Sequence, residues 1–358
     1  MTRTGKTTLR YVFGAGAVLV TLGSSTIAAA DERYSAIVMD ARTGEVLQQD
    51  AADEERFPAS LTKMMTLYML FEALDRGDLS LDTRLTASRH AASMPPSRLG
   101  LRRGDSITVE QAIRAMVVQS ANDVAVMVGE RLGGSESRFA SMMTARAREM
   151  GLTDTHFENA SGLPDPQQHT TARDMALLGQ HLWRDFPARY AYFQTPSNSW
   201  RRTHGLNHNH LLGRVDGVDG IKTGYTRASG FNLVSSAERN GRRVIVVVMG
   251  GESASARDAQ VAYLIDGAFE QFAQRELPGG ATFASLPVNR LDAQIAPNGQ
   301  VQTATTFAPG AAPQGVVVQT LSTAHGPLGP LPPRAQGDAN STDEDDSAAT
   351  QQPVTGAH

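Results

Sequence analysis

The 358 residues are enough for one large domain or for one domain plus an appendage, and a composition of 41% hydrophobic and 20% charged residues is typical of a soluble globular protein. The net charge of -4 makes nucleic acid an unexpected partner, because nucleic-acid binding usually requires a clustered basic surface. The chain has no cysteine, which excludes disulfides, thiolate metal sites and thiol nucleophiles.

The first 30 residues have the three-part pattern of a secretory signal peptide. Basic residues precede an apolar run over 11–22, and Ala28-Ala29-Ala30 provides small residues for cleavage before Asp31. An uncleaved membrane anchor is the alternative, but the apolar run is short for the roughly 20 residues that span a bilayer. We therefore expect residues 1–30 to be removed and the mature protein to be exported across the cytoplasmic membrane to the periplasm, soluble or peripherally attached.

Short periodic segments follow in chain order. Alternating apolar residues over 34–39, a turn containing Gly44 and the pair Val46-Leu47 predict two strands. Apolar residues at intervals of three and four then predict a series of helices, over 60–75, 109–132 (one helix or a pair), 135–150 and from Thr171 onward, where Asp174 occupies the capping-box position.

A second group of strands lies between 216 and 277. Residues 220–224 and two β-branched runs, 231–237 and 244–249, predict three strands, and Asn240-Gly241 between the last two is a strong hairpin signal. Helical spacing returns over 259–272. Strands at both ends of a helical middle predict an α/β fold, with one mixed sheet flanked by helices and a mainly helical subdomain.

From about Pro278 the composition shifts to Gly, Ala, Pro, Gln, Thr and Ser, with an acidic run over 343–346. Such a segment offers little apolar surface to bury, so we predict that residues 278–358 form a low-complexity, disordered tail. A small β-rich module within 282–325 is the alternative. The folded domain is accordingly predicted over 31–277.

The first candidate catalytic pair is Ser60 and Lys63, in the segment Ser60-Leu61-Thr62-Lys63. Side chains three apart on a helix share a face, so the lysine amine can act as the base for the serine hydroxyl. That role requires burial or a second cation to lower the pKa of the lysine. Taken alone, the pair is more simply explained as a helix-capping serine beside a solvated lysine.

Two further elements favour the catalytic interpretation. Ser120 and Asn122 lie inside an apolar helical stretch and must find partners there; we predict that Ser120 relays protons near Lys63 and that Asn122 holds Lys63 or the substrate amide. Lys222-Thr223-Gly224 lies on a predicted strand, where Lys222 would be the second cation and Gly224 would let a ligand backbone approach. A local helix break and a strand-edge turn are the alternatives.

Together these elements resemble the low-molecular-mass D-alanyl-D-alanine carboxypeptidases of the penicillin-binding protein family, because Ser-x-x-Lys, Ser-x-Asn and Lys-Thr-Gly occur in that order. The resemblance implies a β-lactamase/transpeptidase-like fold, removal of the terminal D-Ala from peptidoglycan stem peptides ending in D-Ala-D-Ala, and acylation of the same serine by β-lactams. It covers roughly residues 31–275 and is carried by the segments Arg56–Thr66, Ser120–Asp123, Asn159–Leu163, Thr171–Met175 and Val218–Thr226.

The resemblance also implies the roles of the site residues. Ser60 would attack the carbonyl of the penultimate D-Ala, with Lys63 accepting its proton. The backbone N–H groups of Ser60 and Tyr225 would form the oxyanion hole. The remaining implied roles are protonation of the leaving D-Ala by Ser120 and Lys222, and binding of the substrate carboxylate by Thr223 and Arg257.

Some features depart from the family pattern. Relatives often have an arginine in an Asn-x-Asn segment where this chain has Asn207-His208-Asn209, and many have a β-rich stalk and an amphipathic C-terminal helix that are not evident here. Membrane attachment is therefore left open. The histidines at 204, 208 and 210 have no acidic or Cys partner at a recognisable ligand interval, so we expect neither a metal nor a cofactor.

Three alternatives remain. A class A β-lactamase needs a glutamate in a loop between the second and third motifs, but Glu158 here precedes a carboxypeptidase-like segment. A D,D-endopeptidase that cuts cross-links would share the fold and the motifs. A non-catalytic binding protein is disfavoured because all three catalytic elements are intact. We therefore predict a serine-type D-Ala-D-Ala carboxypeptidase, with the endopeptidase as the main alternative.

Overall fold

The computed structural model describes residues 33–201, 203–275, 294–295 and 301–302. The predicted signal peptide over 1–30 lies outside these residues, as does nearly all of the predicted tail over 278–358. Within that tail only Gln294–Ile295 (β10) and Val301–Gln302 (β11) are described, as an antiparallel pair. Among the described residues, no helix combines the length and the hydrophobicity needed to cross a membrane.

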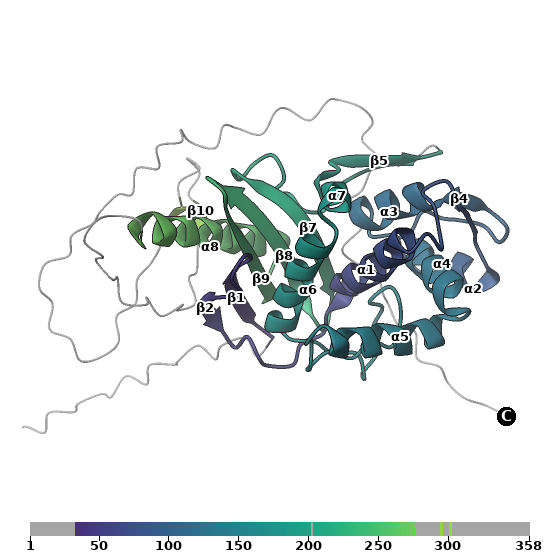
Figure 1. Cartoon of the computed structure of the whole chain (residues 1–358), viewed down its shortest axis with the longest axis horizontal. Coiled ribbons are helices and arrows are strands. Elements are labelled where there is room, and N and C mark those ends of the chain that lie inside the picture. The colour runs from purple at the N-terminus through teal and green to yellow at the C-terminus, as the bar shows by residue number, and fades with distance from the viewer. Residues whose placement is uncertain (1–32, 202, 276–293, 296–300, 303–358) are drawn as a thin grey trace, which may run out of the picture. The chain divides into compact units, whose positions relative to one another are not determined.

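Five strands form the sheet at the centre of the fold (Figure 1): β1 (Ser35–Asp40), β2 (Val46–Asp50), β7 (Val218–Thr226), β8 (Gly230–Arg239) and β9 (Arg242–Gly251). Their order in the sheet is β2-β1-β9-β8-β7. All of its pairings are antiparallel, so the expectation of a mixed sheet is wrong in this respect. Consecutive strands are joined by hairpins, and the long helical segment between β2 and β7 returns the chain so that β9 runs antiparallel to β1.

The hairpin between β8 and β9 turns at Asn240-Gly241, as its sequence predicted. Both turn residues have positive φ, 50° for Asn240 and 71° for Gly241, which is the conformation of a two-residue type I′ turn. Such a turn matches the twist of the flanking strands and fixes their register. This pairing leaves β7 at the edge of the sheet, where one side of the strand is open.

Helices cover both faces of the sheet, and each face has its own apolar core. The side chains of Val38, Val246 and Val248 pack in the cluster that includes α8 (Ala254–Arg275). Residues at the alternating positions of the same strands, such as Ile37 and Val247, pack in the larger cluster with the other helices. The two-residue period of a strand explains this division, since successive side chains point to opposite faces.

The helical subdomain lies beside the sheet (Figure 1). The apolar stretch over 109–132 is a helix pair, as one of its two interpretations predicted. Thr171 caps its helix through the N–H of Asp174, but the Asp174 carboxylate bonds Thr155 and so does not complete a capping box. The remaining elements are η1 (Ala59–Leu61), α1 (Thr62–Asp75), β3 (Arg84–Thr86), α2 (Arg89–Ala92), β4 (Ser106–Thr108), α3 (Val109–Val118), α4 (Asn122–Gly133), α5 (Glu136–Glu149), α6 (Ala172–Asp185), α7 (Pro187–Tyr190), η2 (Ala191–Gln194), β5 (Ser197–Trp200) and β6 (Thr203–Leu206).

Candidate active site

Ser60 lies in the short 3₁₀ turn η1, which leads directly into α1. The capping positions of η1 and α1 are Pro58 and Leu61, so Ser60 is not a helix cap. Its Oγ lies instead 2.9 Å from Nζ of Lys63, one turn further along. The simpler interpretation of this pair, a capping serine beside a solvated lysine, is therefore wrong.

Lys63 is the centre of a buried hydrogen-bond cluster. Its side chain is 0% exposed, and its Nζ also lies 2.8 Å from Oδ1 of Asn122 and 2.6 Å from the carbonyl oxygen of Ser161. Those two oxygens are acceptors, so each takes one N–H from the amine. A neutral amine has two N–H groups and one lone pair, and the lone pair then points at Ser60 Oγ. In that state the Ser60 hydroxyl donates to Lys63, as a general base requires.

Burial and a neighbouring cation both favour the neutral amine. Loss of hydration holds the pKa of Lys63 well below its ordinary value, and the Lys222 cation lowers it further, while the Asp123 carboxylate opposes both. The oxygens of Asp123 accept backbone N–H groups of residues 99–101, so the carboxylate also fixes that loop. Lys63 thus has the lowered pKa that a lysine requires to act as a base.

Ser120 and Asn122 lie where α3 ends and α4 begins. Asn122 accepts from Lys63 through Oδ1 and donates through Nδ2 to the carbonyl oxygen of Pro95 at 3.0 Å, so its amide links two walls of the site. Ser120 has a left-handed φ of 54°, and its buried Oγ has no hydrogen-bond partner among the described residues. The expected contact of Asn122 is present, whereas Ser120 offers an unpaired hydroxyl, the kind of group that a bound substrate can satisfy.

The edge strand β7 passes very close to the turn that carries Ser60. A Cβ added to Gly224 would lie 3.0 Å from the backbone nitrogen of Ser60 and 3.1 Å from the carbonyl oxygen of Pro58. The glycine therefore makes room for the chain's own turn, where the sequence predicted room for a ligand. The approach brings the backbone of Tyr225 near that of Ser60, and the Tyr225 ring lies tilted against the ring of Phe231 at a centroid distance of 4.2 Å.

Lys222 and Arg257 form a buried cationic region beside Lys63. Lys222 is 2% exposed, and burial together with the Arg257 charge lowers its pKa to about 7. Its Nζ donates to the carbonyl oxygen of Thr223 at 2.9 Å. Arg257, in the first turn of α8, donates to the carbonyl oxygen of Asn232 at 3.0 Å. Lys222 and Arg257 are therefore close together, and the Arg257 guanidinium is also paired with the Asp258 carboxylate at 2.8 Å.

His208 also lies within reach of these cations. Burial lowers its pKa to about 4, and the charges of Lys222, His210, Lys63 and Arg257 add to the effect. The loop is fixed by its two asparagines, of which Asn209 donates to the carbonyl oxygen of Gly220 at 2.8 Å. Among the described residues, no cluster of three or more His, Cys, Asp or Glu side chains could hold a metal ion.

Residues 23–253 match the model of the peptidase S11 family, which is described as D-alanyl-D-alanine carboxypeptidase. The chain belongs to this family. It is 38% identical over 262 residues to the D-alanyl-D-alanine carboxypeptidase DacA of Escherichia coli and 35% identical over 255 residues to DacF of Bacillus subtilis. These alignments cover 71% and 70% of this chain, and the chain spans 65% of the length of each relative.

Solved structures of penicillin-binding proteins share the fold. Penicillin-binding protein 5 from Haemophilus influenzae has a TM-score of 0.64 at 33% identity, covering 66% of this chain and 70% of that one. Penicillin-Binding Protein D2 from Listeria monocytogenes, solved in its ampicillin-bound form, has a TM-score of 0.60 at 31% identity, covering 66% and 96%. The expected transpeptidase-like fold is therefore confirmed for this S11 chain, with an antiparallel sheet.

Several residues that hold Lys63 and the turn of Ser60 in place were not predicted from the sequence. The carbonyl oxygen of Ser161 accepts from Lys63, and Asn159 Oδ1 accepts from the N–H of Gly162 at 2.7 Å, which holds that loop in place. Asn232 donates to the carbonyl oxygen of Phe57 at 3.0 Å and so ties the chain before Ser60 to the sheet. The segment containing Asn159 was noticed only as part of a family resemblance, because backbone contacts leave no periodic signal.

Replacing Gly162 by alanine is expected to damage the site more than a typical surface substitution. Gly162 has a φ of 87°, and an added Cβ would lie 1.9 Å from the carbonyl oxygen of Ala59 and 3.0 Å from the backbone nitrogen of Ser60. Gly151 has a nearly equal φ of 85°, and no neighbouring atom of the described part of the chain would lie within 4 Å of an added Cβ, so Gly151→Ala is a matched control for backbone strain alone. We expect Gly162→Ala to lose most penicillin acylation and Gly151→Ala to retain it. Equal acylation rates in the two variants would contradict this account.

Proposed function

We propose that this chain is a serine-type D-Ala-D-Ala carboxypeptidase that removes the terminal D-Ala from peptidoglycan stem peptides through an acyl-enzyme on Ser60. One observation carries the proposal: both N–H groups of a neutral Lys63 are bonded to Asn122 and Ser161, so its lone pair is left for the Ser60 hydroxyl. The S11 family membership and the named activity of the relatives support the same reaction.

In acylation, Ser60 Oγ forms a bond to the carbonyl carbon of the penultimate D-Ala while its proton moves to Lys63. The negative charge that develops on the carbonyl oxygen is stabilised by the N–H groups of Ser60 and Tyr225, an arrangement worth a factor of about 100 to 1,000 in rate per donor. The C–N bond then breaks, and the leaving D-Ala amine takes up a proton through Ser120 and Lys222. Water hydrolyses the ester and regenerates Ser60.

The terminal carboxylate of the substrate is bound in the cationic region. Thr223 offers a hydroxyl, and Lys222 and Arg257 offer positive charge in a buried setting where electrostatic attraction is weakly screened. His208 lies at the same region as a neutral donor, in the position where many relatives have an arginine. β-Lactams carry an equivalent carboxylate and an acylating carbonyl, so we propose that they acylate Ser60 at this site.

Lys222→Ala is expected to move the acid limb of the acylation rate to higher pH. The Lys222 cation disfavours protonated Lys63, so its removal raises the pKa of Lys63 and leaves less neutral base at a given acidic pH. Lys222→Arg keeps a cation and is the matched control. The measurement is the second-order rate of penicillin acylation across pH. An acid limb that stays in place in Lys222→Ala would contradict the proposed electrostatic role.

Export to the periplasm, where stem peptides occur, is proposed from the leader over 1–30, and the catalytic domain is proposed to end near residue 277. We therefore expect that removing residues 280–358 leaves the release of D-Ala from a soluble peptide unchanged. The last turn of α8 ends at Arg275, before this deletion. A large loss of activity on soluble peptide would contradict a domain boundary at that point. Loss of activity only on membrane-associated substrate would instead indicate an attachment role for the tail.

Product analysis tests the proposed reaction. The purified mature protein is incubated separately with a pentapeptide stem ending in D-Ala-D-Ala and with a cross-linked stem dimer. Release of D-Ala from the pentapeptide, with the dimer left intact, is the expected result. Cleavage of the dimer in preference to the pentapeptide would identify the endopeptidase, and rapid turnover of penicillin with neither peptide cleaved would identify a β-lactamase.

A further inference from the structure

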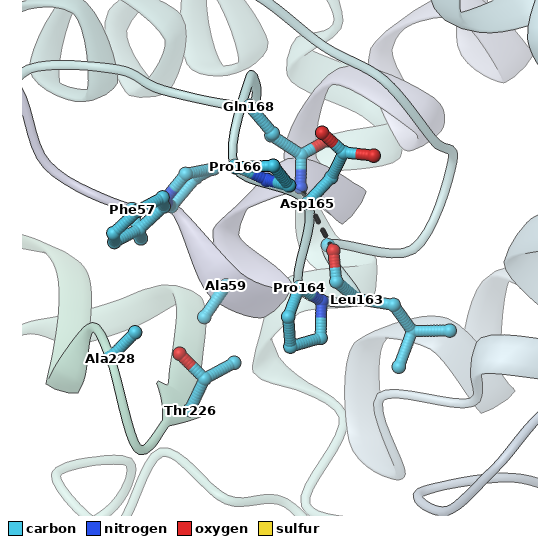
Figure 2. A pocket seen from close by; sticks show the side chains of 11 residues that line it. Phe57, Ala59, Leu163, Pro164, Asp165, Pro166, Gln168, Thr226 and Ala228 are labelled. Atoms are coloured by element: carbon cyan, nitrogen blue, oxygen red, sulfur yellow. Dashed lines mark hydrogen bonds between the residues drawn. The ribbon is translucent and has the colours of Figure 1, made fainter. Parts of the chain in front are cut away.

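The carbonyl oxygen of Ser161, which accepts from Lys63 at 2.6 Å, belongs to the loop over 158–168. Hydrogen bonds within the loop hold its shape. Figure 2 shows one of them, in which the side-chain amide of Gln168 donates to the carbonyl oxygen of Leu163. The position of the loop relative to Lys63 depends instead on its contacts with the neighbouring helices.

Ala160, the residue before Ser161, is in contact with three helices. Its N–H donates to Oε1 of Glu136, the first residue of α5, at 3.1 Å. Its carbonyl oxygen accepts from Oγ1 of Thr66, on α1, at 2.7 Å. Its Cβ lies 3.2 Å from the place that a Cβ would take at Gly129 of α4. Because Ala160 is 0% exposed, the loss of either hydrogen bond leaves a buried polar group unsatisfied.

The two donors on α1 act on successive carbonyl groups of the loop. Lys63 and Thr66 lie one turn apart on the same face of the helix, and they donate to the carbonyl oxygens of Ser161 and Ala160. A shift of Ala160 therefore displaces the acceptor of Lys63. Without that acceptor, one N–H of the neutral amine is left unpaired, and the lone pair is no longer directed at Ser60.

Glu136 is well placed to hold the N–H of Ala160. Its side chain is 14% exposed, and its Oε2 lies 2.6 Å from Nε2 of His90 on α2. Its place in the first turn of α5 favours a negative charge, because the N-terminus of a helix is positive. A carboxylate is also a stronger hydrogen-bond acceptor than a neutral oxygen. Glu136 thus joins α2, α5 and the loop at one point.

We propose that Glu136 is a positioning residue for the general base Lys63. By holding the N–H of Ala160, Glu136 keeps the carbonyl oxygen of Ser161 in place to accept from the lysine amine. Thr66 has the same role through the carbonyl of Ala160. The inference rests on the proposed function and adds two residues that its base requires. Neither residue bonds a group that reacts, so they affect the rate of acylation and not the affinity for penicillin.

Glu136→Ala and Glu136→Gln test the proposal through the first-order rate constant of acylation at saturating penicillin. This rate constant, unlike the amount of acyl-enzyme, does not depend on the fraction of protein that is folded. We expect it to fall by about 10- to 100-fold in Glu136→Ala, since a misplacement of about 1 Å can cost this much. Glutamine keeps an acceptor oxygen, so Glu136→Gln should retain most of the wild-type rate. Glu110→Ala, in the first turn of α3, is the control for loss of a charge at a helix start.

Thr66→Val and Thr66→Ser test the second hydrogen bond independently. Valine has nearly the shape of threonine without the hydroxyl, so the carbonyl of Ala160 loses its donor, whereas serine keeps it. We expect Thr66→Val to acylate slowly and Thr66→Ser to acylate at close to the wild-type rate. Because Glu136 and Thr66 hold the same residue, the double variant Glu136→Ala/Thr66→Val should be slowed by less than the product of the two single effects.

Several results would overturn the positioning role. One is a wild-type acylation rate constant in Glu136→Ala, and another is a loss of penicillin affinity with the rate constant unchanged. Acylation by Glu136→Gln that is as slow as that of Glu136→Ala would assign the effect to charge and contradict the hydrogen-bond mechanism. Failure of the proposed function is seen separately, as wild-type protein that is acylated by penicillin but releases no D-Ala from a pentapeptide. The acylation rates would still decide the role of Glu136 in that case.

Discussion

Ser60→Ala is expected to abolish both penicillin labelling and D-Ala release, with a loss of about 10⁴-fold or more in turnover, as is typical when the nucleophile of a serine hydrolase is removed. Ser60 is the serine whose hydroxyl bonds a buried lysine amine, at 2.9 Å. Removing its Oγ leaves the fold in place, because Ser60 caps no helix. The measurement is covalent labelling by fluorescent penicillin together with D-Ala release from a pentapeptide.

Ser141→Ala, at an exposed position of α5, is the control and should keep both activities. Thermal melting of the wild-type protein, Ser60→Ala and Ser141→Ala distinguishes a loss of catalysis from a loss of folding. Covalent labelling of Ser60→Ala at the wild-type rate would refute the assignment of the nucleophile.

Lys63→Met is expected to reduce the rate of acylation by a comparable factor while the protein remains folded. Methionine fills a similar volume without the amine, so Ser60 loses its base. The exchange also leaves Asn122 Oδ1 and the Ser161 carbonyl without a donor, which costs roughly 1 to 3 kcal/mol for each unsatisfied group. Removing an amine from a fully buried position offsets part of that cost, since burial of its charged form is unfavourable.

Lys63→Arg distinguishes a base from a positive charge. Arginine can donate to the same oxygens, but its guanidinium stays protonated in proteins. A base role predicts that Lys63→Arg is as slow as Lys63→Met in penicillin acylation. Substantial acylation by Lys63→Arg would show that the positive charge is what matters, and would contradict proton transfer to Lys63.

The parts of the fold that depend on local sequence were predictable. The Asn240-Gly241 hairpin, the helix from Thr171 and the first two strands follow from turn chemistry, capping and periodicity, which act over a few residues. The direction of β1 relative to β9 was not predictable in this way. More than a hundred residues of helical chain separate these strands, and periodicity carries no information about the direction in which such a chain returns.

The side chains of the candidate site could be predicted from the sequence, whereas its backbone contacts could not. Ser60, Lys63, Asn122 and Lys222 stand out because polar groups in apolar or strand contexts need partners. The Ser161 carbonyl oxygen accepts a hydrogen bond from Lys63. It does not stand out in the sequence, because every residue has a carbonyl group. The closeness of His208 to the cations likewise depends on how one loop packs against α8 and β7, which only the three-dimensional fold determines.

The central claim, an acyl-enzyme on Ser60, is tested most directly by locating the adduct that a β-lactam leaves. Trypsin cleaves after Arg56 and Lys63, and the resulting peptide Phe57–Lys63 contains Ser60 as its one serine. The protein is quenched in acid after reaction with penicillin, digested and mapped by tandem mass spectrometry. The penicilloyl mass is expected on Ser60 within this peptide. An adduct on a serine elsewhere, with Phe57–Lys63 recovered unmodified, would contradict it.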